Sequence, residues 1–108
     1  WLSWNQIYAE IARAADVEAK LVHVPSEVIA RYDKEWGDGL LGDKAHSMIF
    51  DNAKIRRLVP DFNPKISFAE GARQIVAWYL SDSACQIVDA EFDALNDRII
   101  KAQQRALP

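Results

Sequence analysis

The sequence predicts an α+β fold that is mostly helical, with four or five helices and two short strands. Apolar residues recur with the period of a helix in several segments, and residues that cap helices precede most of these segments. Two short runs are instead rich in residues that favour strands. The chain has 108 residues, half of them apolar, which suffices for one domain with its own core. We therefore expect a single domain that spans residues 1–108.

The first helix is expected from about residue 4 to residue 15. Ser3 and Gln6 have the spacing of a capping box, in which each side chain accepts a hydrogen bond from the backbone of the other residue. Apolar side chains then follow at helical spacing, at Trp4, Ile7, Tyr8, Ile11 and Ala15.

A strand, a helix and a glycine-containing turn are expected next. Lys20 to Val24 is short and rich in β-branched residues, and Pro25 ends it, so we predict the first strand there. Ser26 is a suitable cap for a second helix. The apolar side of that helix would contain Val28, Ile29 and Tyr32. The Gly37-Asp38-Gly39 segment is expected to break the helix, and a loop follows it.

The second strand and a short helix are predicted in the middle of the chain. Ser47 to Phe50 is the second short run that fits a strand. Asp51 or Asn52 is expected to cap a helix over Ala53 to Leu58. The segment Val59 to Lys65 contains two prolines and is therefore expected to be a loop.

Two further helices complete the prediction. Ser67 and Glu70 have the spacing of a second capping box. The apolar face of the helix that follows contains Phe68, Ala72, Ile75, Val76 and Tyr79. Asp89 is expected to start the last helix. Its apolar stripe consists of Phe92, Leu95, Ile99 and Ala102.

The composition argues against several classes of function. The formal net charge is −3, whereas a nucleic-acid-binding surface needs an excess of Lys and Arg. The longest apolar run, Ile75 to Leu80, is far too short to cross a bilayer. Cys85 is the only cysteine, so no internal disulfide can form, and a single thiol fits a reducing compartment. We expect a cytoplasmic protein with neither nucleic acid nor a membrane as partner.

A glycine motif in the chain has the residue spacing of the dinucleotide-binding consensus, but the segments around it do not have the secondary structure that the consensus requires. Gly37 to Gly42 reads G-x-G-x-x-G, and Asp61 lies nineteen residues after the last glycine. In a dinucleotide-binding fold a buried strand leads into the glycines and a helix starts after them. Here the preceding Ala30 to Trp36 is polar and helix-like. We interpret the motif as a turn and expect no cofactor-binding residue in this chain.

No catalytic constellation or metal site is predicted. Tyrosine followed by lysine four residues later would place an acid/base pair on one helix face. The positions four residues after Tyr8, Tyr32 and Tyr79 hold Ala12, Trp36 and Ser83. The two histidines are far apart in sequence, so a metal site with three or four ligands is not expected.

The better candidate for a ligand contact is His46, which lies in a polar loop beside Asp43 and Lys44. A surface histidine is the alternative interpretation. His23 is interpreted as a core or surface residue, and Cys85 has no histidine near it in sequence that would make it a nucleophile.

Three segments in order resemble the carboxy-terminal half of the extended short-chain dehydrogenases, the NAD(P)-dependent epimerase/dehydratase family. Leu2 to Tyr8 is similar to the family's "(S/T)-W-x-x-I" helix opening. Asp51 to Leu58 is similar to its "D-x-x-K" segment. Phe68 to Gly71, leading into Val76 to Tyr79, resembles its "E-G-I…W-Y" helix. The resemblance extends from residue 2 to about residue 100.

The resemblance implies a two-part enzyme, of which this chain is the substrate-binding part. An amino-terminal Rossmann domain, absent from this chain, would hold NAD or NADP and the catalytic Tyr/Lys pair. The substrate would be a small molecule, in many members a sugar linked to a nucleotide. The family's Arg-x-Gly-Asp segment corresponds to Leu40 to Asp43, in which leucine replaces the arginine that contacts the diphosphate. The chain begins with Trp1 rather than Met, and we expect it to be cut from a longer protein.

The residues expected to contact substrate are Trp4, Asp43 and His46. The alternative is a freestanding helical protein-interaction domain without enzymatic activity, and a third hypothesis, an enzyme with its own active site, lacks a catalytic constellation. A homodimer is compatible with the first hypothesis. If the first hypothesis holds, an apolar surface should be exposed where the missing domain would dock.

Overall fold

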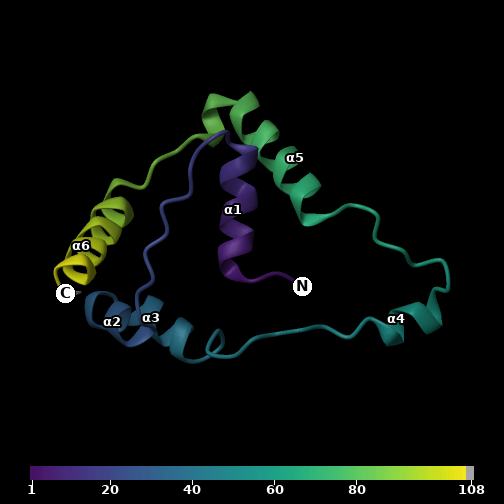
Figure 1. Cartoon of the computed structure of the whole chain (residues 1–108), viewed down its shortest axis with the longest axis horizontal. Coiled ribbons are helices and arrows are strands. Elements are labelled where there is room, and N and C mark those ends of the chain that lie inside the picture. Colours follow the sequence, from purple (N-terminus) through teal and green to yellow (C-terminus); the bar gives the residue numbers. More distant parts are fainter. Residues whose placement is uncertain (107–108) are drawn as a thin grey trace. The chain divides into compact units, whose positions relative to one another are not determined.

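The computed structural model describes residues 1–106, and this part of the chain is mostly helical, as predicted (Figure 1). Between Trp1 and Ala106 there are six α-helices and one short 3-10 helix. They are α1 (Trp4–Ala14), α2 (Ser26–Tyr32), α3 (Lys34–Leu41), α4 (Ala53–Leu58), α5 (Phe68–Ser81), η1 (Ser83–Cys85) and α6 (Ala90–Ala106).

Neither predicted strand is formed in residues 1–106. Lys20 to Val24 and Ser47 to Phe50 carry no regular secondary structure. The composition of these segments favours strands, but a strand also needs a neighbour that shares its backbone hydrogen bonds. Neither segment has such a neighbour in the described part of the chain, so this part of the predicted fold class is not observed.

The chain divides into two compact units. Unit 1 consists of Trp1–Lys20 and Met48–Gln86, and unit 2 consists of Leu21–Ser47 and the residues from Ile87 onward. Each unit is formed by two segments that are distant in sequence, so neither corresponds to a simple half of the chain.

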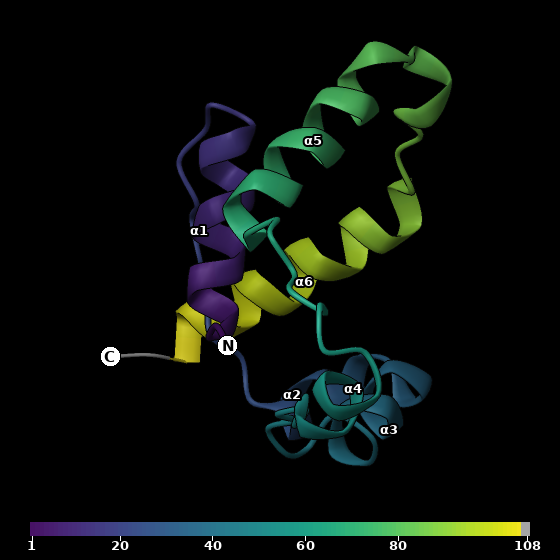
Figure 2. The same cartoon turned by 90° about the vertical axis from the view of Figure 1, so that its right-hand side faces the viewer.

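In unit 1, α1 packs against α5 (Figures 1 and 2). The predicted capping box starts α1, because the Gln6 amide donates to Ser3 Oγ (3.3 Å) and the Ser3 amide donates to Gln6 Oε1 (2.8 Å). At the start of α5, the Glu70 amide donates to Ser67 Oγ (3.2 Å). The Glu70 carboxylate pairs with Arg73 instead of returning to Ser67, so only half of the second capping box forms.

The end of α1 is a Schellman turn. The Val17 amide donates to the Ala12 carbonyl (3.0 Å), and the Asp16 amide donates to the Arg13 carbonyl (3.2 Å). Asp16 has a φ of 55°, a left-handed conformation that glycine usually adopts at this position. The turn satisfies two carbonyls that the end of a helix would otherwise leave without a donor.

In unit 2, α2 packs against α3 and contacts α6. Asp33 separates α2 from α3 and caps α3, because its Oδ1 accepts a hydrogen bond from the Trp36 amide (2.9 Å). The rings of Trp36 and Phe92 lie with their centroids 5.3 Å apart, which joins α3 to α6. The predicted break at residues 37–39 is therefore wrong: the helix breaks at Asp33, and α3 continues through both glycines.

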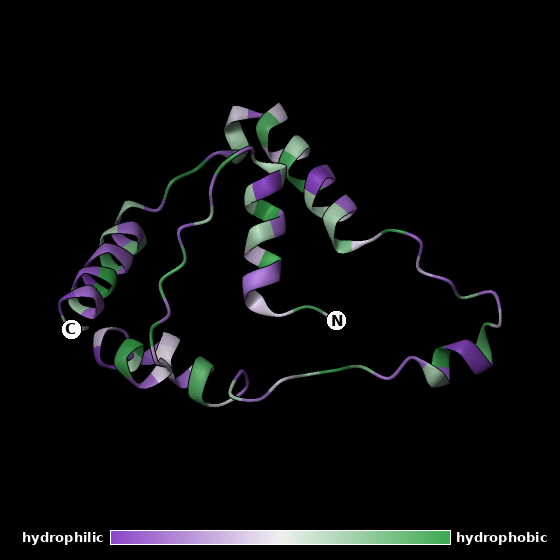
Figure 3. Ribbon diagram, in the orientation of Figure 1, coloured by the Kyte–Doolittle hydropathy of each residue, from purple (hydrophilic) through white to green (hydrophobic). Residues whose placement is uncertain are grey.

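The buried apolar core is small in both units. In residues 1–106, the buried apolar side chains are Ala72 in unit 1 and Leu95 and Ile99 in unit 2. Apolar positions along α1 and α5 alternate with polar ones, as in amphipathic helices (Figure 3). Several of these apolar side chains remain exposed, including Ile75 (67%) and Trp78 (63%) on α5.

Candidate functional site

Trp4 is the first residue of α1 and is 69% exposed. Its ring lies 6.1 Å from the ring of Tyr8, one helical turn later, at an angle of 35°. The capping box positions Trp4, because the hydrogen bonds between Ser3 and Gln6 define the first turn of the helix. The exposed indole offers a flat apolar surface and one hydrogen-bond donor, a combination that is suited to ligand contact.

Asp43 and His46 lie in the turn that follows α3, and both are exposed. The turn is held by backbone hydrogen bonds from the Gly42 amide to the Asp38 carbonyl (2.9 Å) and from the Lys44 amide to the Gly39 carbonyl (3.1 Å). Lys44 Nζ lies 3.4 Å from Asp43 Oδ2. Asp43 and His46 share this turn in unit 2, whereas Trp4 belongs to unit 1.

Beside this turn, unit 2 has an open depression with a volume of about 430 Å³. We call it the α3 depression, and its lining residues are Asp33, Glu35, Trp36, Gly39, Leu40 and Lys44. Trp36 and Leu40 provide apolar surface, and Lys44 connects the depression to Asp43 through their ion pair. A β-carbon on Gly39 would meet nothing within 4 Å, so the glycine leaves one side open. Apolar surface with a charged rim is suited to a small polar molecule that has an apolar ring or face.

Trp36 and Gly39 were not among the residues predicted to contact a ligand. Trp36 was treated as the end of a helix and Gly39 as part of a turn, so neither was expected to line a hollow. The signal that would have identified them is the spacing of Asp33 and Trp36, which is that of an N-cap and its third helical residue. A helix that starts at Lys34 places Trp36 and Leu40 on one face.

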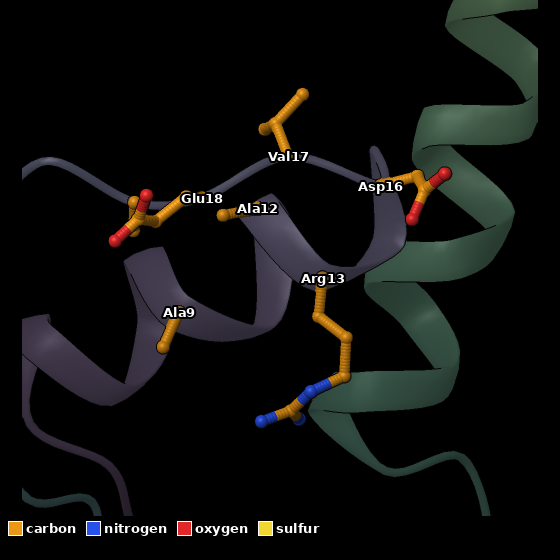
Figure 4. Close-up of a pocket in the computed structure, with 7 residues that line it drawn as sticks. Ala9, Ala12, Arg13, Asp16, Val17 and Glu18 are labelled. Carbon is orange, nitrogen blue, oxygen red and sulfur yellow. The ribbon is translucent and has the colours of Figure 1, made fainter.

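Unit 1 has a second open depression, of about 450 Å³, at the end of α1 (Figure 4). It is lined by Ala9, Ala12, Arg13, Asp16, Val17, Glu18 and Ala19. The chain reversal of the Schellman turn forms this hollow. Arg13 pairs with Glu10 (2.5 Å), and in Figure 4 the side chains of Arg13 and Asp16 extend in different directions. No group of polar side chains converges there on one point.

The glycine motif does not form a phosphate-binding loop. Gly37 and Gly39 lie inside α3, and the Gly37 amide donates to the Asp33 carbonyl (3.0 Å). A pyrophosphate cradle requires amides at a helix start that are not engaged by the helix itself. The residues of this motif therefore do not fit a dinucleotide, and no chemical step can be assigned to one here.

The perturbed ionisable groups belong to pairs on exposed helix faces. A hydrogen bond to Asp38 raises the pKa of Lys34, and the Arg73 guanidinium hydrogen-bonded to Glu70 lowers the pKa of that carboxyl. Both pairs connect residues three or four positions apart on one helix. This arrangement is typical of solvated helix surfaces, so these shifts do not indicate acid/base catalysis.

No group of three or more His, Cys, Asp or Glu side chains is placed to hold a metal ion within the described range. No helix within residues 1–106 is both long and apolar enough to cross a membrane. His23 is exposed, and Cys85 is half-buried in η1.

No protein-family model, curated protein or solved structure matches this chain.

Proposed function

We propose that this chain is the carboxy-terminal, substrate-binding part of an NAD(P)-dependent enzyme of the epimerase/dehydratase type. The three segments that resemble this family support the proposal, and each of them is associated with a helix. The "(S/T)-W-x-x-I" segment opens α1, the "D-x-x-K" segment leads into α4, and the "E-G…W-Y" segment lies in α5. The finer part of the proposed fold, a subdomain of an extended short-chain dehydrogenase, depends on this resemblance.

The observation on which the proposal depends most is the incomplete burial of apolar surface. The chain exposes 9451 Å² of surface in total, whereas two separate compact globules, each of half its mass, would together expose about 7300 Å². The exposed side chains include many large apolar ones, among them Ile75 and Trp78. The excess therefore exists even if each unit is considered alone, and it supports a role in which another domain covers apolar helix faces.

In the proposed parent enzyme, a Rossmann domain outside this chain would hold NAD or NADP, which would supply the hydride chemistry, and would also contain the acid/base tyrosine. Lys20 to Val24 and Ser47 to Phe50 then form strands by joining a larger sheet. Trp4, Asp43 and His46 contact the substrate, which is a small molecule such as a sugar or nucleotide-sugar. The α3 depression beside Asp43 adds apolar surface for that substrate.

The experiment is a nicotinamide assay of the full parent protein with a panel of sugars and nucleotide-sugars. We expect turnover that changes the absorbance of the nicotinamide, and we expect Asp43→Asn to raise KM. The loss of a charged hydrogen bond costs about 1.5–3 kcal/mol, so the increase should be about tenfold or more. Asp61→Asn, which changes another exposed loop aspartate, is the matched control and should leave KM unchanged.

Two results would contradict the proposal. One is a parent protein without any nicotinamide-dependent reaction, which would favour the alternative of a freestanding helical interaction domain. The exposed faces of Ile75 and Trp78 would then serve a protein partner. The other is an equal effect of the Asp43 and Asp61 variants on KM, which would remove Asp43 from the substrate site.

A further inference from the structure

We draw no further inference here: the strongest candidate, the exposed apolar face of α5 formed by Phe68, Ile75 and Trp78 around Gly71, carries nothing because nothing in the structure shows what covers it.

Discussion

Gly37 of α3 lies directly against Ala30 of α2, so close that a β-carbon on Gly37 would overlap the Cα and Cβ atoms of Ala30. Gly37 is buried, and the atoms that it meets include backbone, which cannot move aside as a flexible side chain can. The glycine therefore permits the close approach of the two helices. This role differs from the turn that the sequence predicts at the same position.

Gly37→Ala should separate α2 from α3 and destabilise unit 2. Overpacking of this kind costs about 1–3 kcal/mol, which exceeds the gain of at most about 1 kcal/mol from the higher helix propensity of alanine. Amide hydrogen exchange of residues 26–41 measures the change, and exchange should become faster.

The matched control is Gly39→Ala. This glycine also lies inside α3, but a β-carbon there would meet nothing within 4 Å. Amide exchange in residues 26–41 should therefore become slower, because the free energy of local opening should rise by about 0.5–1 kcal/mol. Equal effects of the two substitutions would show that residues 37–39 form a turn and that the contact with Ala30 is absent.

Asp16→Gly should stabilise the end of α1. Asp16 has a φ of 55°, and a residue with a β-carbon in this conformation loses about 1 kcal/mol relative to glycine. The substitution also removes a negative charge next to the negative end of the helix dipole. We expect a gain of about 0.5–1 kcal/mol, measured by urea titration of the far-ultraviolet circular dichroism.

The neighbouring Ala15→Gly is the control for the glycine itself. Ala15 has a φ of −87°, where glycine only adds freedom to the unfolded chain, so this variant should lose stability. If Asp16→Gly destabilised the helix as much as Ala15→Gly does, the Schellman turn would not be the conformation of this segment.

The ion pair of Glu70 and Arg73 predicts a pH dependence of α5. The hydrogen bond from Arg73 lowers the pKa of Glu70, so the folded state binds its proton less tightly than the unfolded state does. The stabilisation is therefore complete above the ordinary pKa of glutamate, and it is lost as the pH falls through the lowered pKa of the folded state. Because both side chains are exposed, salt should weaken the effect.

A carbon-detected NMR titration of the Glu70 carboxyl measures this pKa. Arg73→Gln should move it back towards the ordinary value, whereas Arg57→Gln on α4 should not change it. An unchanged Glu70 pKa in the Arg73 variant would show that the pair does not persist in solution.

The starts of α1, α5 and α6 could be predicted because they depend on residues that are neighbours in sequence, whereas α2 starts without the side-chain cap expected from Ser26. Ser3 with Gln6 identified the start of α1, and Asp89 identified the start of α6, where its Oδ1 accepts from the Phe92 amide (3.0 Å). Whether the two strand-like segments form strands could not be predicted from their neighbours in sequence, because a strand needs a pairing partner that is distant in the chain. The break at the glycines was wrong for a similar reason, since the need for Gly37 arises from Ala30 on another helix.

The candidate site was predictable only in part. The sequence predicts a polar loop that contains Asp43 and His46, and the structure has a turn there, although the helix before it, α3, was not predicted. Trp36 was missed because the helix start at Lys34 was not recognised, and its second neighbour, the ring of Phe92, is distant in sequence. That ring is 56 residues later in the sequence, beyond the reach of local patterns.

The chain alone should neither bind NAD(P) tightly nor turn over a substrate. Its glycine motif lies inside α3, and no tyrosine is followed by lysine four residues later. Isothermal titration of the chain with NAD and with NADP should give no measurable heat at micromolar concentrations. Binding with a micromolar Kd would contradict the proposal that another domain binds the cofactor.

The most direct test of the proposed function is the sequence of the reading frame upstream of Trp1. We expect about two hundred residues that begin with a strand, a glycine-rich turn and a helix, as in a dinucleotide-binding domain, and that contain a Tyr-x-x-x-Lys motif. A start codon next to Trp1, or an upstream region without both features, would contradict the account.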